Sequence, residues 1–176
     1  MPNPNRQLTD AQIRNSRLVF YKEDIQAIDS TLREFLARSK SRTAMLVDKD
    51  GHLITREGDT DMTEMDVDTI SALVAGCFAA TREMARILGE DEFTALFHQG
   101  RKDNLQLTLV GERTILAVLF NESTTIGMVR LYAAEAARKL TSLFRKILSR
   151  GESGHGSEKL AEFDKAAAST LDDVFG

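Results

Sequence analysis

Apolar residues recur every three or four positions in three long stretches of the chain. This spacing places them on one side of an α-helix, so helices are predicted over about residues 21–39, 66–88 and 124–148. The apolar residues of the first stretch are Ile25, Ile28, Leu32, Phe35 and Leu36. Basic residues follow this stretch, as is favourable at a helix C-terminus. Each helix is therefore expected to bury one face.

Shorter apolar runs between these helices predict five strands. Residues 44–47 and 52–55 flank Asp50-Gly51, a pair that readily takes the positive φ angles of a hairpin turn. Three further strands are predicted over residues 93–100, 105–110 and 114–120. The order is helix, two strands, helix, three strands, helix, which indicates an α/β fold.

The two ends of the chain differ from its middle. Residues 1–17 hold both prolines and no sustained apolar period, which predicts a flexible N-terminal arm. The folded domain is expected over residues 18–149, and a linker rich in Gly and Ser over residues 150–158. Residues 159–176 again show helical spacing of apolar residues, with acidic residues among them. They are predicted to form an amphipathic helix that contacts a partner.

The second helix is the most informative element, because its apolar residues do not stop at one stripe. The residues predicted to lie on the sheet are Ile70, Leu73, Val74, Cys77, Met84 and Leu88. The residues predicted on the opposite side are all small: Ala72, Ala75, Gly76 and Ala79. Glycine inside a helix costs about 1 kcal/mol relative to alanine, which favours a docking surface for another macromolecule. The alternative is that alanine is present only as a good helix former.

Charge and composition exclude several classes of protein. Lys and Arg number 23 and Asp and Glu 27, a net charge of −4, and no basic block suggests nucleic-acid binding. Six carboxylates precede or begin the second helix, where they complement its positive end: Glu57, Asp59, Asp61, Glu64, Asp66 and Asp68. No stretch resembles a signal peptide or a membrane span, and Cys77 is the only cysteine. A cytoplasmic protein is expected.

No active site is visible in the sequence. The three histidines, His52, His98 and His155, have no zinc-site spacing, and the Asp48–Gly51 turn lacks the pattern of a calcium loop. Motifs of P-loop, Gly-x-Ser-x-Gly and dinucleotide-binding proteins are absent. Cys77 fits a small buried thiol better than a nucleophile. We predict no catalytic residue, no metal and no cofactor.

Several segments together resemble the roadblock/dynein-light-chain family. They are the hairpin over residues 46–54, the helix segment 73–80, Phe97-His98-Gln99-Gly100, Leu109-Val110-Gly111, residues 126–131 and the ending 171–175. The resemblance runs from about Leu18 to the end. It implies the order α-β-β-α-β-β-β-α, with a five-stranded antiparallel sheet, helices on both faces and a C-terminal amphipathic helix.

The resemblance also implies a function. Bacterial members of this kind are homodimers that pair their second helices and central strands, and they stimulate GTP hydrolysis by a Ras-like small GTPase without inserting an arginine. The positions that match GTPase docking are Ala72, Ala75, Gly76, Ala79 and Glu83, and those that match docking by the tail are Leu171, Val174 and Phe175. Thr81-Arg82-Glu83 is bulkier than the family pattern. The alternatives are a noncatalytic scaffold of the same family and a small-molecule sensor.

Overall fold

The computed structural model describes the backbone of residues 20–59 and 61–175 and the side chains of residues 20–59 and 61–150. Its elements are α2 (Lys22–Ser39), β1 (Thr43–Asp48), β2 (Leu53–Gly58), α3 (Glu64–Ile87), β3 (Ala95–Gln99), β4 (Asn104–Val110), β5 (Thr114–Phe120) and α4 (Ile126–Phe175). The predicted order of helices and strands is confirmed.

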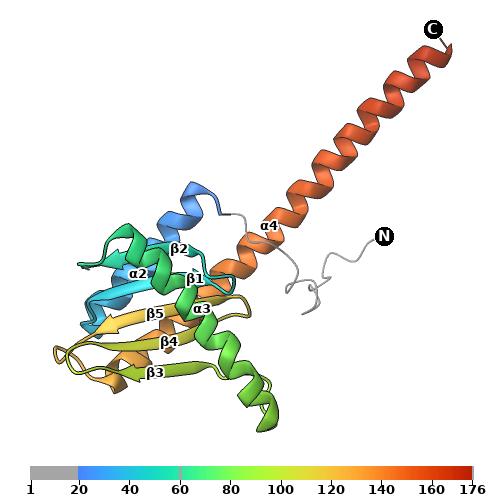
Figure 1. The fold of residues 1–176 in the computed structure, drawn as a ribbon. Helices are drawn as coiled ribbons and strands as arrows, with labels where there is room; N and C mark the ends of the chain where they lie inside the picture. The colour runs from blue at the N-terminus through green and yellow to red at the C-terminus, as the bar shows by residue number, and fades with distance from the viewer. Residues whose placement is uncertain (1–19, 60, 176) are drawn as a thin grey trace. The chain divides into compact units, whose positions relative to one another are not determined.

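The five strands form one antiparallel sheet in the order β2-β1-β5-β4-β3. α3 crosses one face of this sheet, and α2 and the first part of α4 lie on the other face (Figure 1). β1 and β5 are central, so nearly all their side chains are buried instead of alternating between core and solvent. The α/β fold with helices on both faces is therefore confirmed.

The chain forms two compact units, Tyr21–Leu143 and a second unit made of Met1–Phe20 and Phe144–Gly176. The first contains the whole sheet. In the second, the ring of Phe20 packs edge-on against Phe144 with 5.9 Å between centroids. The backbone of α4 continues as helix through residues 150–158, where a linker was predicted. The predicted arm over residues 1–17 lies outside the described residues, and the proposed domain boundaries stay predictions.

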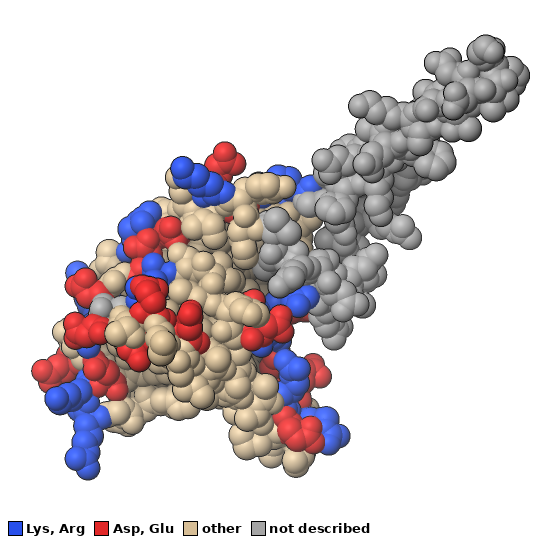
Figure 2. All heavy atoms as spheres, turned by 45° about the horizontal axis from the view of Figure 1, so that its top comes forward, with Lys and Arg blue, Asp and Glu red and all other residues tan. Residues whose placement is uncertain are grey.

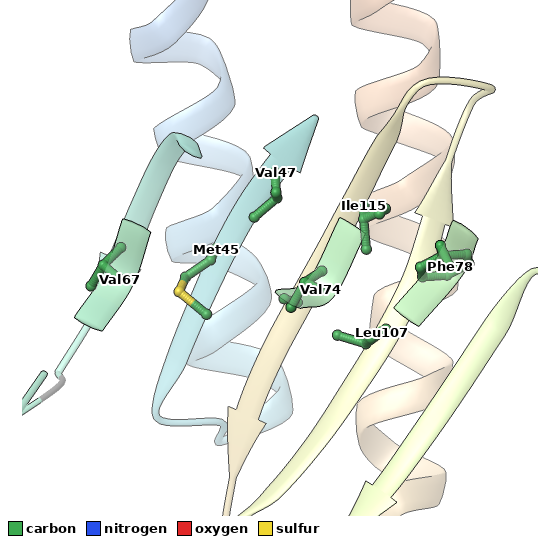
Figure 3. Packing of buried hydrophobic residues seen from close by; sticks show 8 residues of the cluster. Met45, Val47, Val67, Val74, Phe78, Leu107 and Ile115 are labelled. Carbon is green, nitrogen blue, oxygen red and sulfur yellow. The ribbon is translucent and has the colours of Figure 1, made fainter. Parts of the chain in front are cut away.

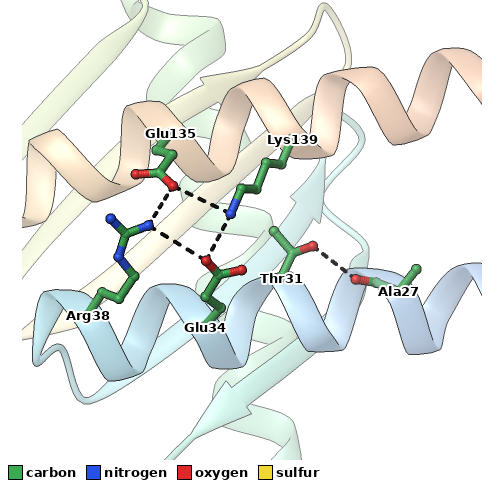
Figure 4. A network of polar contacts seen from close by, with 6 residues as sticks. All are labelled: Ala27, Thr31, Glu34, Arg38, Glu135 and Lys139. Atoms are coloured by element: carbon green, nitrogen blue, oxygen red, sulfur yellow. Dashed lines mark hydrogen bonds and ion pairs between the residues drawn. The ribbon is translucent and has the colours of Figure 1, made fainter.

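Two helices on the same face of the sheet are joined by a network of four alternating charges (Figure 4). Arg38 of α2 contacts Glu135 of α4 and Glu34 of its own helix, and Lys139 of α4 contacts the same two carboxylates. Arg38 also lies over the ring of Tyr132, 4.5 Å from its centroid. The hydrogen bond from Arg38 is the main reason that the pKa of Glu135 is lowered.

We expect the free energy of unfolding to decrease less on acidification when Glu135 is replaced by glutamine. A carboxyl group whose pKa is lowered by folding stabilises the native state above its ordinary pKa, and this contribution is lost as pH falls through the lowered value. Urea unfolding between pH 7 and pH 3 measures the difference. Glu122→Gln is the control, because Glu122 makes no ion pair with the described residues; an equally reduced pH dependence in that variant contradicts the assignment.

A second prediction concerns Gly58, the last residue of β2. Its φ is +98°, and an added Cβ would overlap the carbonyl oxygen of Arg42. Gly89, after α3, also has a positive φ of +79°, but an added Cβ there has nothing within 4 Å. Gly89→Ala should cost about 1 kcal/mol from backbone strain alone, and Gly58→Ala about 3 kcal/mol because the overlap adds to the strain. Urea unfolding of both variants tests this, and equal losses would rule out the overlap.

Candidate functional site

α3 begins at a well-formed N-terminal cap. The hydroxyl of Thr63 accepts a hydrogen bond from the backbone N–H of Asp66, and the Asp66 carboxylate accepts one from the N–H of Thr63. The Thr63 hydroxyl also donates to the Asp66 carboxylate at 2.7 Å, and this bond, followed by the one from the Thr63 backbone N–H, lowers the pKa of Asp66. The cap fixes where α3 starts and therefore which residues point outward.

The carboxylates around the start of α3 were predicted to complement the positive end of the helix. Two of them instead form ion pairs with other elements. Glu57 pairs with Arg33 of α2 at 2.7 Å, and Glu64 pairs with Arg56 of β2. Only Asp66 caps the helix by hydrogen bonds.

The inward side of α3 packs on the sheet through large apolar residues (Figure 3). Val67, Val74 and Phe78 are at most 2% exposed and form one cluster with strand residues Met45, Val47, Leu107, Ile115 and Ala117. Ser71 lies on the same side, and its hydroxyl donates to the carbonyl of Val67, so burial leaves no unpaired group there. This packing sets the orientation of the whole helix.

An outward stripe runs along the opposite side of α3. It consists of Met65, Ala72, Gly76, Ala79, Glu83 and Ile87, all exposed. Met65 and Ile87, near its ends, are 79% and 74% exposed, and between them Ala72, Gly76 and Ala79 are small and Glu83 is charged. A Cβ added at Gly76 would have nothing within 4 Å, so no contact among the residues that the structure describes requires glycine there. Ala72 differs, because its backbone packs closely on the β1–β2 turn. A Cβ added at Gly51 in that turn would lie only 2.9 Å from the Cα of Ala72.

A second exposed apolar set lies beside this stripe. Leu73 is 63% exposed, and Met84 and Leu88 are also exposed; Cys77, between them, is partly buried and packs against the core, as predicted. At 100° per residue these residues lie on one flank of α3, about a quarter to a third of a turn from the outward stripe. We call this set the α3 flank. It gives α3 two exposed apolar faces in addition to its buried one.

These observations correct two predictions about α3. Ala75, predicted on the outward side, is only 7% exposed. Leu73, Met84 and Leu88, predicted to lie on the sheet, are exposed instead. The buried direction passes through Val67, Ser71, Val74 and Phe78, so Ala75 borders the core and the larger residues turn away from it. Ala72, Gly76, Ala79 and Glu83 are on the outward side as predicted.

The sheet itself is left open next to α3. α3 packs on β1, β2 and β5, and β3 at the end of the sheet has one edge paired with no strand of the described chain. On the α3 side, Leu96 of β3 and Leu105 of β4 remain only partly buried. An unpaired strand edge with apolar residues beside it is the kind of surface that another chain covers.

Charged side chains border the α3 flank, and one of them, Glu83, belongs to the outward stripe. Figure 2 shows a broad uncharged area with acidic and basic side chains around it. Glu83 pairs with Arg86, and the hydrogen bond from Arg86 lowers the pKa of Glu83. Arg82 lies 3.5 Å from Glu92. Both arginines of α3 therefore already hold a carboxylate.

A different surface was not singled out by the sequence. A hollow of about 680 Å³ opens between the β3–β4 turn and the start of α4, with the stacked rings of Phe97 and Phe120 among its lining. Among the described residues no group of three His, Cys, Asp or Glu could hold a metal ion. No helix in that part of the chain is long and apolar enough to cross a membrane. The side chains of Leu171, Val174 and Phe175 lie outside the described residues.

Comparisons with known proteins agree with the fold. Myxococcus xanthus MglB shares 36% identity with a TM-score of 0.67, over 74% of this chain and 96% of that chain. The gliding protein MglB of Thermus thermophilus shares 29% identity with a TM-score of 0.69, over 75% and 98%. An MglB with a tetrameric arrangement shares 29% identity with a TM-score of 0.70, over 76% and 98%. A search of curated proteins gave no match.

A family model for the Roadblock/LC7 domain matches residues 27–120, more than half of the chain. This match covers α3, the whole sheet and most of α2. The resemblance noted in the sequence is thereby confirmed, and the chain belongs to the Roadblock/LC7 family.

Proposed function

We propose that this chain is a homodimeric regulator of a Ras-like small GTPase of the MglA type, and that it stimulates GTP hydrolysis by positioning the partner's switch regions. The observation that carries the proposal is the outward stripe of α3, which exposes small and apolar side chains where a free helix would expose charge. The similarity to MglB proteins supports it.

Self-association uses the α3 flank and the free edge of β3. Pairing β3 with the same strand of a second copy satisfies its unpaired backbone groups and extends the sheet. It also covers Leu96 and Leu105 with the flank residues of both copies, led by Leu73 and Met84. The MglB with a tetrameric arrangement is a relative that assembles beyond a single chain.

GTPase docking uses the outward stripe, which stays free when the flank is covered. Gly76 and Ala79 let the partner's backbone approach closely, and Met65 and Ile87 supply apolar contacts at either end. Ala72 and Glu83 complete the surface. Ala75 is not part of it, because it is buried.

A surface that donates no arginine can still contribute to the acceleration of GTP hydrolysis that the proposal requires. Activators of small GTPases accelerate hydrolysis by about 10³–10⁵, which is about 4–7 kcal/mol of transition-state stabilisation. Because phosphoryl transfer depends on positioning, a rigid surface that binds one switch conformation selectively contributes to that total. Arg82 and Arg86 of α3 form ion pairs with Glu92 and Glu83, which fits activation without a donated arginine.

The test is the hydrolysis rate of a purified MglA-type GTPase loaded with GTP, with and without this protein. The proposal predicts acceleration of at least about tenfold that saturates with protein concentration. Binding without acceleration would favour the noncatalytic scaffold. A rise in melting temperature with a small molecule and no GTPase present would favour the sensor.

We also propose that the C-terminal segment contacts the bound GTPase through Leu171, Val174 and Phe175 and changes nucleotide exchange. Because this segment belongs to the same chain as the docking surface, its contacts with a bound GTPase form within one complex, which makes weak contacts effective. A chain ending at Arg150 is expected to dimerise normally but to change the rate of GDP release. Release of a fluorescent GDP analogue measures this, and identical rates with both chains would remove the segment from the mechanism.

A further inference from the structure

His98 lies on the side of the sheet that carries α3. β3 pairs with β4 so that Leu96 is opposite Leu107 and His98 is opposite Leu105. Leu107 belongs to the core beneath α3, and Leu96 and Leu105 pack against that core. Because side chains alternate between faces along a strand, His98 shares this face. It is exposed in the single chain, on an otherwise apolar part of the sheet.

The proposed homodimer would bury this histidine. A two-fold axis perpendicular to the sheet pairs β3 with the β3 of the second copy and keeps both α3 helices on the same face. Residues directly opposite each other in an antiparallel pair share a face, and a register that pairs β3 along its whole length, Ala95–Gln99, places His98 opposite Leu96 of the second copy. The flank residues Leu73 and Met84 of the two copies then lie above that face.

The charged groups around His98 do not compensate a positive charge there. β4 carries no charged residue between Asn104 and Val110. The α3 flank carries none between Leu73 and Leu88, and Asp66 lies at the far end of the helix. The β3–β4 turn carries Arg101, Lys102 and Asp103, of which Asp103 pairs with Arg42 at 2.8 Å. The second copy supplies the same groups and a second His98.

We propose that His98 makes self-association of this chain dependent on pH, so that the dimer weakens as pH falls from about 8 to 5.5. Histidine side chains become charged in this range. Burying a charged imidazole beside Leu96 and Leu105 is unfavourable, so the free chains bind more protons than the dimer does. By linkage, association releases protons and is weaker at low pH. This inference rests on the homodimer of the proposed function.

The test is sedimentation equilibrium of the full chain at pH 8, 7, 6 and 5.5. The Kd is expected to rise on the order of tenfold to a hundredfold over this range, since up to two protons are linked to each dimer. His98→Gln should remove most of this dependence. His52→Gln is the matched control, because His52 is exposed in the β1–β2 turn next to Asp48 and should leave the dependence unchanged.

Each outcome is decisive. A dimer with the same Kd at every pH, or a pH dependence that survives His98→Gln, overturns the inference and leaves the homodimer standing. A chain that stays monomeric at pH 8 overturns the inference together with the proposed homodimer. Circular dichroism at each pH establishes that all variants are folded.

Discussion

Replacement of Leu73 by glutamate should raise the Kd of self-association by about a hundredfold or more and leave the fold intact. Leu73 is 63% exposed in the single chain, so the change costs little stability there. In the proposed dimer the glutamate must be buried against Leu96, Leu105 and the second α3. Burying an unpaired carboxylate costs several kcal/mol, and central interface residues commonly carry about 2–4 kcal/mol.

The measurement is sedimentation equilibrium at pH 8, with thermal unfolding as a check on folding. Leu131→Glu is the matched control, because Leu131 is 61% exposed on α4, on the opposite face of the sheet. It makes the same chemical change away from the proposed interface and should leave the Kd unchanged. Equal weakening by both variants, or by neither, would exclude the α3 flank as the dimer interface.

The elements of the fold could be predicted because each segment has a clear local period. The stripe from Ile28 to Phe35 matches the buried side of α2, where Ile28, Leu32 and Phe35 are buried. The Asp50-Gly51 turn joins β1 and β2, with Gly51 at a φ of +91°. Neighbouring residues along the chain determine where such helices and turns form, so these elements can be predicted from a single sequence.

The orientation of α3 was harder to predict, because hydrophobicity alone does not identify its buried side. Ser71 and Ala85 are fully buried while Leu73 and Met84 are exposed. Ser71 is tolerated in the core because its hydroxyl bonds to the carbonyl of Val67. Hydrophobicity alone assigns the larger residues to the sheet, whereas an interface with another chain needs apolar residues of its own.

A local sequence pattern does not predict that one edge of β3 is unpaired. The sequence shows a strand around Phe97, but whether that strand ends the sheet depends on the strand order, which is set by pairings between distant segments. The same applies to His98, which in the sequence is only a histidine in a strand. Its position on the α3 side follows from its pairing with Leu105.

The prediction with the largest functional effect concerns Ala79. Ala79→Arg should reduce stimulation of GTP hydrolysis to the basal rate while the chain stays folded and dimeric. Ala79 is exposed on the outward stripe, about 120° around the helix from Leu73, so the new side chain blocks docking without reaching the α3 flank. Losing a stimulation of about 10³–10⁵ is among the largest effects that one surface substitution can have.

The same substitution at two other alanines separates docking from stability. Ala134→Arg places an exposed arginine on α4, away from α3, and should leave stimulation unchanged. Ala75→Arg puts a long charged side chain at a position only 7% exposed, so it should lower the melting temperature before it affects docking. Hydrolysis assays and thermal unfolding of all three variants give three distinct patterns. If Ala79→Arg kept full stimulation, the GTPase would have to bind elsewhere, because a bulky cation in the middle of the outward stripe is incompatible with a closely packed partner.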